Sequence, residues 1–534
     1  MLLPRFLLIA VCLPLATAAE VGGAPRLPNI VFAFADDYGR YASAYASHDA
    51  RPTVNRLIRT PNIDAVAAAG ILFLNAHVSS PSCTPCRSAI LSGRHFWQTG
   101  RGAILSGAVW DEQIPSYPLL LRGSGYHIGK SHKVWSPGTP ADAPYGGQRH
   151  AYESAGREFN AFSQNVAKAV SNGTPLAEAK EKLYDEVRGN FREFLGQRKP
   201  DQAFCYWFGP TNTHRTWTRG SGKSQWSIDP DSLEGHLPAF LPDVAEIRED
   251  FADYLGECLA FDAAIGVLLE QLKQAGELEN TLFVISGDHG APGFPHGKCN
   301  LYDFGTAVTL AISGPGIPGG RVVSDQVSLP DLAPTFLDAG RVKIPLGMTA
   351  KSLLPLLRSE KSGSVEIERN FVVTGRERHV DAARDGNLPY PQRAIRTAEY
   401  LFILNFEPDR YPTGDLYPPG RPNRVPTAEE ILKNSRATFA DMDAGPTKSW
   451  LFQRRDNPRW ETEVNHAFGK RPAEELYLLS DDPDQVRNLA ADPDFAADKI
   501  RLREQLLKFL ATSEDPRVTG DGLTFERPPF ASAP

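Results

Sequence analysis

The chain has little cysteine, and the spacing of the cysteines argues against two common classes of protein. Six cysteines occur in 534 residues, and only Cys83 and Cys86 form a Cys-x-x-Cys pair. No second such pair and no His-x-x-x-His follows to complete a zinc site. The cysteines beyond Cys12 also lack the regular spacing of a disulfide framework. A redox dithiol at Cys83 and Cys86 remains an alternative, although that motif normally lies in a much smaller domain.

The chain also lacks an excess of positive charge and any long apolar segment. Its formal net charge is −7 at pH 7, so we do not expect nucleic acid as a partner. No apolar stretch approaches the roughly 20 residues of a membrane-spanning helix, so we expect no transmembrane anchor. With 41% hydrophobic and 23% charged residues, the composition is that of a globular protein. The length favours one large domain and a smaller one.

The first residues have the pattern of a signal peptide. Arg5 precedes an apolar run over residues 6–15, and residues 16–18 form an Ala-x-Ala cleavage signal. The apolar run is too short to span a bilayer. We therefore predict that residues 1–19 are a signal peptide. The mature protein is then exported, either to a periplasm or outside the cell, or to a lysosomal-type lumen in a eukaryote.

Between residues 27 and 360 the chain alternates between strand and helix patterns. Residues 29–35 are a continuous apolar run, as expected for a buried central strand of an α/β sheet. A helix is predicted to begin at Thr60 and Pro61, because Thr suits the N-cap and Pro the first helical position. Residues 251–275 fit a long amphipathic helix. The sequence therefore predicts an α/β fold.

Side chains that bind ligands or move protons follow the ends of several predicted strands. Four strands are followed in this way: residues 29–35 by Asp36 and Asp37, 125–129 by Lys130 and His132, 203–208 by His214, and 281–286 by Asp288 and His289. Each cluster alone is also typical of a turn, a helix cap or a solvated strand end. Their conjunction around residues 83–87 favours a ligand site, because open α/β sheets bind ligands at this edge.

Two further motifs complete a pattern that is highly specific. Residues 83–87 read Cys-x-Pro-x-Arg, with Ser-Gly-Arg at 92–94, and the carboxyl-terminal part has a Glu-Leu-Tyr run that begins at Glu475. With the strand-end clusters and Lys298, they make the chain resemble the type I, formylglycine-dependent sulfatases of the alkaline phosphatase superfamily. The resemblance covers nearly the whole mature chain. It implies a large mixed, mostly parallel sheet flanked by helices, and a smaller C-terminal antiparallel sheet with a helix.

The resemblance assigns the motif cysteine a role as precursor of another group. In this family that cysteine is oxidised to formylglycine, whose hydrated form is a geminal diol. By resemblance Cys83 is this residue, while Pro85 and Arg87 belong to the segment that a formylglycine-generating enzyme reads. Cys86 occupies the variable position and is assigned no chemistry. One hydroxyl of the diol attacks sulfur, and the other later expels sulfate by collapse to the aldehyde.

The resemblance also implies a metal site. The residues expected to hold the ion are Asp36, Asp37, Cys83, Asp288 and His289. Carboxylate oxygens are hard ligands that suit Ca²⁺, which polarises a sulfate oxygen and lowers the pKa of the diol. His289 stands where many relatives have asparagine. Imidazole is a softer ligand than an amide oxygen, so Mg²⁺ or Mn²⁺ is the alternative to Ca²⁺.

The remaining motif residues acquire catalytic roles by the same resemblance. Arg87 would orient the diol, and Lys130 and Lys298 would neutralise the sulfate oxygens as charge develops. His132 would act as the base that takes a proton when the diol breaks down. His214 would be the acid that protonates the leaving group.

The carboxyl-terminal part is predicted to be a smaller α+β domain. We place the catalytic domain at residues 27–365 and the smaller domain at 366–534, the latter with strands at 371–374 and 400–404. A helix is predicted at 496–511, and residues 405–460 are predicted to form a long loop over the site or at an interface. Three residues lie where relatives contact substrate, although surface charge at a strand end explains them equally well: Arg376, Arg378 and His379.

The sequence leaves the substrate open. Residues 116–121, 129–132 and 300–307 look most like the heparan sulfamidase branch, whose members hydrolyse the N-sulfate of glucosamine. Lys298 and His289 depart from that branch, so an O-sulfated glycan from animal matrix or algal wall is the alternative. A phosphoester or phosphonate hydrolase of the same superfamily is a weaker rival, because no second metal cluster is evident. A non-catalytic glycan-binding protein is also a weaker rival. The sequence does not indicate an oligomeric state.

Overall fold

The computed structural model describes residues 26–417, 419–420 and 423–532, so the predicted signal peptide lies outside the described residues. A seven-stranded sheet forms the centre of the molecule, in the order β3-β4-β1-β5-β6-β2-β7. Only β6 runs antiparallel to its neighbours. The strands are β1 (Asn29–Ala35), β2 (Ile71–His77), β3 (His127–His132), β4 (Phe204–Gly209), β5 (Thr281–Gly287), β6 (Ala311–Ser313) and β7 (Arg321–Ser328). The predicted mixed, mostly parallel sheet is confirmed.

Side chains of the central strand β1 feed two separate cores, one on each face of the sheet. Val31 and Ala33 belong to one buried cluster, whereas Ile30 and Phe32 belong to the other. Successive side chains of a strand point to opposite faces, so a strand buried on both sides reads as a continuous apolar run. This explains why the sequence of β1 shows no polar alternation.

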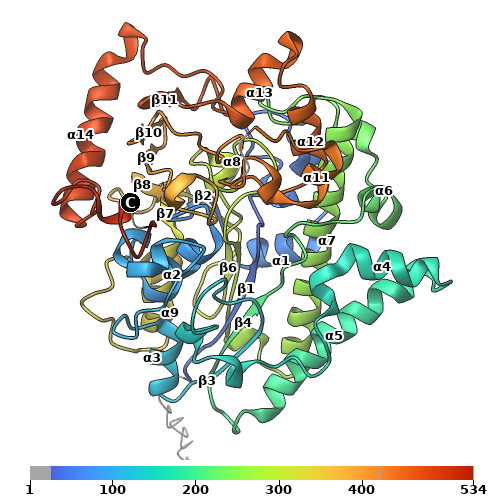
Figure 1. Ribbon diagram of the computed structural model, residues 1–534. Helices are drawn as coiled ribbons and strands as arrows, with labels where there is room; N and C mark the ends of the chain where they lie inside the picture. The colour runs from blue at the N-terminus through green and yellow to red at the C-terminus, as the bar shows by residue number, and fades with distance from the viewer. Residues whose placement is uncertain (1–25, 418, 421–422, 533–534) are drawn as a thin grey trace, which may run out of the picture.

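Helices cover both faces of this sheet (Figure 1). Helices α1, α4, α5 and α7 contribute to the first cluster, and α2, α3, α9 and α10 to the second. The helices of this part are α1 (Pro61–Ala69), α2 (Cys83–Ser92), α3 (Tyr117–Gly123), α4 (Phe162–Ser171), α5 (Leu176–Gln197), α6 (Ser221–Trp226), α7 (Ala245–Gln274), α8 (Asp303–Thr306), α9 (Leu332–Ala339) and α10 (Leu354–Arg358). No helix among the described residues is long and apolar enough to cross a membrane.

A second, four-stranded antiparallel sheet follows in the order β11-β10-β9-β8. It consists of β8 (Phe371–Arg376), β9 (Gln392–Thr397), β10 (Tyr400–Asn405) and β11 (Glu474–Leu478). Helix α14 (Ala496–Thr512) lies beside it and buries Leu502, Leu506 and Leu510 against Phe402 and Leu476 (Figure 1). The predicted small antiparallel sheet with a terminal helix is confirmed, while the division at residue 365 stays a prediction.

Two local expectations were wrong. Residues 405–460 are not one long loop, because α11 (Ala428–Lys433) and α12 (Pro446–Gln453) form within them, followed by α13 (Glu461–Phe468). Leu451 and Phe452 join the core beside α7, which gives this segment an apolar face to bury. The strand predicted at 125–129 instead spans His127–His132.

Candidate active site

The carboxyl ends of adjacent strands bring the predicted cluster together. Ala35 in β1 pairs in parallel with Gly287 in β5, so Asp36 and Asp288 leave the sheet side by side. The backbone N–H of Asp37 donates to Asp288 Oδ1 at 2.7 Å, and Asp37 has a positive φ of 58°. Asp tolerates this left-handed conformation better than most residues. The local backbone thus turns both carboxylates toward one point.

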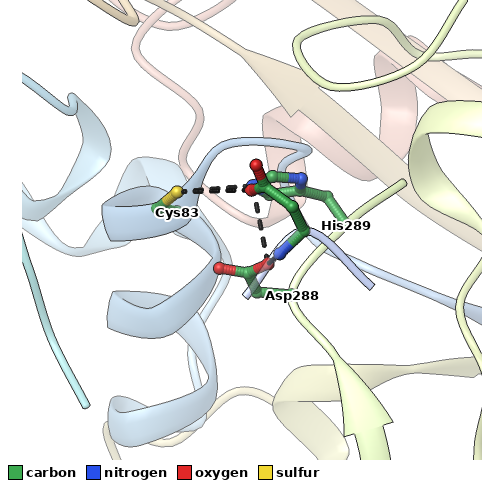
Figure 2. Close-up of side chains that lie close together, drawn as sticks. Cys83, Asp288 and His289 are labelled. Carbon is green, nitrogen blue, oxygen red and sulfur yellow. Dashed lines mark hydrogen bonds and ion pairs between the residues drawn. The ribbon is translucent and has the colours of Figure 1, made fainter. Parts of the chain in front are cut away.

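Cys83 meets these residues from the opposite side, at the first turn of α2. Its Sγ lies 3.5 Å from His289 Nε2 and 3.8 Å from Asp37 Oδ1. Figure 2 shows Cys83, Asp288 and His289 pointing toward one another. His289 Nε2 is also 3.2 Å from Asp37 Oδ1. The sulfur atom therefore faces a carboxylate and an imidazole. Cys83, Asp37 and His289 lie together, as expected if they belong to one site.

Two buried cations and the partly exposed Lys133 balance the three buried carboxylates. Arg87 lies between two of them, with Nε donating to Asp288 Oδ2 at 2.9 Å and Nη2 to Asp36 Oδ1 at 3.1 Å. Lys298 Nζ donates to Asp37 Oδ2 at 3.1 Å. Lys133 Nζ lies 2.7 Å from both oxygens of Asp36. Arg87 therefore orients the carboxylates, and its other contacts are backbone carbonyls. Its role in orienting the diol stays a prediction.

Burial and these partners shift the pKa values of Asp36 and Asp288 in opposite directions. Burial alone would raise the pKa of Asp36, but Lys133 and then Arg87 hold that pKa well below its ordinary value. Burial raises the pKa of Asp288 despite His289 and Arg87 beside it. Two neighbouring carboxyl groups thus differ in how readily they ionise, because only Asp36 has a lysine against both oxygens.

Of the two predicted lysines, Lys298 lies at this site and Lys130 does not; Lys133 lies there in addition. Lys130 was expected to face the anion, but its ammonium pairs with Asp142 Oδ2 at 2.8 Å and contacts Gln148. Because β3 continues to His132, Lys130 lies inside the strand and projects from the face of the sheet instead of over its edge. Lys133 follows the strand end and reaches Asp36. Its place just beyond the strand is the signal that could have identified it.

We expect Lys133→Ala to be far more harmful to turnover than Lys130→Ala. Removing Lys133 leaves Asp36 buried without its strongest partner and removes a positive charge beside the nucleophile. A loss of about 10²–10³-fold in kcat is typical for removal of one such electrostatic contact. Lys130→Ala should mainly lower the melting temperature, since it breaks a buried ion pair. Steady-state kinetics and thermal melts of both variants test this, and a larger kinetic loss for Lys130→Ala would contradict it.

The predicted histidines are only partly brought together. His214 lies at the cluster, with Nε2 3.4 Å from Lys298 Nζ and its Nδ1 bound to the Arg215 carbonyl. His132 lies against Phe208, with Nδ1 3.0 Å from Asn160 Nδ2. Burial, then Arg157 and Lys130, lower the pKa of His132 to about 3. A positive φ of 67° turns its side chain out of the strand alternation, and no described contact joins it to the cluster. Its role as a base stays a prediction.

The three predicted substrate contacts have different surroundings. Arg376 is buried and donates to Asp441 Oδ2 at 2.9 Å, so it is bound within the protein. His379 Nδ1 lies 2.8 Å from Ser82 Oγ, immediately before Cys83. Burial, followed by the charge of Lys298, lowers the pKa of His379 to about 3. The residue is therefore a neutral imidazole near the motif cysteine.

Arg378 lines a cleft beside the cluster. The cleft has a volume of about 610 Å³ and is also lined by Ser106, Pro137 and Arg436. Thr84 donates to the Pro137 carbonyl at 2.7 Å, which joins this wall to the first turn of α2. A larger cavity of about 720 Å³ lies between residues 48–55 and the second sheet, and no predicted site residue lines it. Chemistry, not size, identifies the candidate site.

Neither cysteine of the Cys-x-x-Cys pair has the surroundings of a redox thiol. Both are buried in α2, and the structure contains them as free thiols. Burial, then the charge of Asp36, raise the pKa of the Cys83 thiol well above its ordinary value. Burial and Asp288 do the same to the pKa of Cys86. Reactive thiols need a lowered pKa, so the environment disfavours the dithiol alternative.

The donor set fits a hard divalent cation. One ligand atom from each of Asp37, Cys83, Asp288 and His289 can be chosen so that all lie within 4.8 Å of one another. Asp36, Asp37 and His214 form a second such group. Two carboxylates and one imidazole are ligands that Ca²⁺, Mg²⁺ or Mn²⁺ accept. With the carboxylates already balanced by Arg87, Lys133 and Lys298, a bound cation would leave the site positive and suited to an anion.

A second residue at the site was missed by the sequence. Asp443 lies in the segment predicted as a loop, and its Oδ2 is 3.2 Å from Lys298 Nζ. Burial alone would raise the pKa of Asp443, but Lys298 and then His214 lower it below its ordinary value. No motif marks this carboxylate, since its place depends on how residues far apart in the chain fold together.

Comparisons with known proteins agree with this chemistry. A family model described as Sulfatase matches residues 28–342. The chain is 29% identical over 531 residues to the N-sulphoglucosamine sulphohydrolase of Homo sapiens, with 94% of each covered. It is 23% identical over 512 residues to an ulvan-active sulfatase of Formosa agariphila, covering 92% of this chain and 76% of that protein.

A solved structure supports the fold. It is a protein in complex with its substrate D-glucosamine-2-N,6-O-disulfate, and it matches with a TM-score of 0.56 at 18% identity. The match covers 92% of this chain and 98% of that one. Because the family model spans more than half of the chain, this protein belongs to the sulfatase family.

Proposed function

We propose that this protein hydrolyses the N-sulfate of glucosamine in heparan-type glycans. The observation that carries the proposal is the buried group of Asp37, Asp288 and His289 around Cys83, with Lys298 and Lys133 beside it. Such a site is built for a nucleophile at residue 83 and an anion. Similarity to the human N-sulphoglucosamine sulphohydrolase over 94% of both chains supports the N-sulfate.

Two groups that the chain would acquire complete the chemistry. A divalent cation, Ca²⁺ in the first instance, would be held by Asp36, Asp37, Asp288 and His289 and supplies charge neutralisation for a sulfate oxygen. Oxidation of Cys83 to formylglycine supplies a hydroxyl nucleophile, which a buried neutral thiol does not replace. The protein's partner in this maturation would be a formylglycine-generating enzyme.

The chain's own residues bind the sulfate and assist the leaving group. Lys298, held at 3.1 Å by Asp37, places a fixed positive charge where the sulfate oxygens must lie. The side chain of His214 is 35% exposed, the most open of the group, so it faces the side from which the sugar enters. An imidazolium there can donate a proton to the departing atom. Arg378 borders the adjacent cleft, and His379 contacts Ser82 beside Cys83; both are proposed to contact the sugar.

An O-sulfated glycan is the second candidate substrate. Similarity to an ulvan-active sulfatase over 92% of this chain favours it. The same fold also binds a glucosamine that carries both an N-sulfate and a 6-O-sulfate. Export to a periplasm, the cell exterior or a lysosomal-type lumen would bring the protein to either kind of glycan.

A paired desulfation assay tests the proposed function. The matured protein with Ca²⁺ is given glucosamine N-sulfate and, separately, N-acetylglucosamine 6-O-sulfate, and free sulfate is measured. We expect kcat/KM to be higher for the N-sulfate. A preference for the 6-O-sulfate would overturn the N-sulfate proposal, and activity on a phosphate or phosphonate monoester alone would favour the other branch of the superfamily.

His214→Ala should be selective for poor leaving groups. A nitrophenyl sulfate departs as a stable phenolate and needs little help, whereas a sugar oxygen or nitrogen needs a proton in the transition state. General-acid assistance is worth about 10²–10⁴-fold, so we expect a loss of this size on sulfated sugars and a small loss on the nitrophenyl ester. Lys298 contacts the sulfate itself, so Lys298→Ala should reduce both rates similarly. Equal losses for His214→Ala would remove it from the acid role.

A further inference from the structure

Asp443 is held at the mouth of the site by a segment with several buried anchors. This Asp443 segment, residues 435–447, begins after α11 and ends in the first turn of α12. Asp441 accepts from Arg376 at 2.9 Å and from Arg384 at 3.0 Å. The buried ammonium of Lys448 donates to the carbonyls of residues 435, 439 and 442 at 2.6–3.1 Å. The backbone on both sides of Asp443 is therefore fixed.

The segment is also tied to the loop that carries His214. Thr447 Oγ1 donates to Asp250 Oδ2 at 2.6 Å, and Arg215 forms two hydrogen bonds with the same carboxylate at 2.8 Å. At Gly445 an added Cβ would lie 2.5 Å from Arg215 Nη1, so only glycine fits there without a shift. Asp443 and His214 are thus positioned by one shared group of contacts.

Asp37, Lys298 and Asp443 form two successive ion pairs, and the exposure of their side chains shows which side Asp443 faces. The exposed fractions of the side chains rise from 0% at Asp37 to 4% at Lys298 and 18% at Asp443. Asp37 and Cys83 form the floor, so a sulfate must enter first and its sugar must point outward. Asp443 consequently lies on the outward side of Lys298, toward which the atom that leaves sulfur would point.

The carboxylate there is not needed to hold Lys298. Lys298 already donates to Asp37 at 3.1 Å, and burial of an extra carboxylate beside an anion site is electrostatically unfavourable. Asp443 Oδ2 is buried 3.2 Å from Lys298 Nζ, whereas Oδ1 is not among the buried atoms and accepts no hydrogen bond from any of the described residues. One oxygen is therefore free to accept a hydrogen bond from a ligand. A cationic ligand group is the kind that this charge favours.

We propose that Asp443 forms a subsite for the amino group of glucosamine, binding the nitrogen as it leaves sulfur and after it becomes an ammonium. This inference rests on the proposed N-sulfatase function and names the residue that favours nitrogen over oxygen. Asp443 acts on the leaving group, whereas Lys298 acts on the sulfate. The two opposite charges therefore lie on the two sides of the bond that breaks.

The reaction explains why a carboxylate distinguishes the two leaving atoms. The sulfur–nitrogen bond breaks as the sulfuryl group passes to the oxygen of the nucleophile, and nitrogen keeps the bonding electron pair. Nitrogen is basic enough to take one proton before the bond breaks, so it carries positive charge while still attached to sulfur. It then leaves as an amine, which takes a second proton from water at neutral pH. Positive charge thus develops on nitrogen and persists in the product. A sugar oxygen takes one proton and leaves as a neutral alcohol, so it gains little from the carboxylate.

Asp443→Asn tests the subsite, because asparagine keeps the shape and removes the charge. The matched control is Asp456→Asn, an exposed carboxylate in the same part of the chain. A charge-assisted hydrogen bond contributes about 10- to 100-fold to an equilibrium or a rate. We expect Asp443→Asn to lower kcat/KM on glucosamine N-sulfate by about this factor, with a change within about threefold on N-acetylglucosamine 6-O-sulfate. Asp456→Asn should change neither.

A binding measurement separates this inference from the proposed function. Glucosamine and neutral N-acetylglucosamine are titrated into the unmatured Cys83 protein by calorimetry, which requires no turnover. Wild type should bind glucosamine at least about tenfold more tightly than Asp443→Asn does, with no difference for N-acetylglucosamine. Equal binding of glucosamine by both proteins overturns the subsite, as do equal kinetic losses on both sulfates. Wild type that binds glucosamine but does not hydrolyse its N-sulfate overturns the proposed function alone.

Discussion

Cys83→Ala is expected to abolish sulfatase turnover, with a loss of about 10⁴-fold or more, while the protein still folds. Cys83 lies at the floor of the site, 3.5 Å from His289 Nε2 and 3.8 Å from Asp37 Oδ1. Alanine removes the only precursor of the nucleophile at this position and changes the core by one small group. Initial rates on a nitrophenyl sulfate, with a thermal melt to show folding, measure the effect.

Cys86→Ser is the matched control, because it changes the other half of the Cys-x-x-Cys pair. Cys86 is fully buried in the apolar cluster on one face of the sheet, and its side chain forms no hydrogen bond with any of the described residues. Burying a hydroxyl there costs about 1–3 kcal/mol, so the melting temperature should fall while most of the activity remains. Mass spectrometry of the peptide with residues 81–94 should show formylglycine at position 83. Equal inactivation by both substitutions, or a Cys83–Cys86 disulfide in that peptide, would restore the dithiol interpretation.

Asp288→Asn is expected to reduce activity by at least about 100-fold and to remove the response of the protein to Ca²⁺. Asp288 accepts from Arg87 on one oxygen and from the Asp37 backbone N–H on the other. Asparagine keeps the size of the side chain, although its NH2 group cannot accept one of these two hydrogen bonds. It removes one of the negative charges that a divalent ion requires. Burial raises the pKa of this carboxyl group, while His289 and then Arg87 act in the opposite direction.

The metal response has a readout that does not depend on turnover. A ligand at 100 times its dissociation constant stabilises a folded protein by about 2.7 kcal/mol, which shifts the melting temperature of a protein of this size by about 2–4 °C. Wild type stripped with a chelator should lose activity and regain both activity and melting temperature with Ca²⁺. Asp288→Asn should show no shift, whereas the exposed control Asp456→Asn should shift like wild type. Full activity of exhaustively chelated wild type would reject the metal site.

The amino-acid sequence by itself determined the architecture and the centre of the site. The uninterrupted apolar run of β1 predicts a strand buried on both faces, and both faces are covered by helices. Asp36, Asp37 and Asp288 follow such strands directly. Parallel strands end at the same edge, so residues that follow them lie close together whatever the loops do. The Cys-x-Pro-x-Arg motif adds Cys83 and Arg87, whose spacing of four is fixed within one helix.

Only the tertiary structure decided which other charged residues reach this centre. Lys130 and Lys133 are three residues apart, yet a strand end between them sends one to Asp142 and the other to Asp36. Asp443 comes from a segment that reads as a loop. It is placed by the contact of Asp441 with the distant Arg376 and by Lys448, which binds carbonyls of the segment itself. The local sequence pattern determines the direction of a side chain that lies in, or directly follows, a regular strand or helix. It does not fix where an irregular segment lies, because that depends on burial against the rest of the protein.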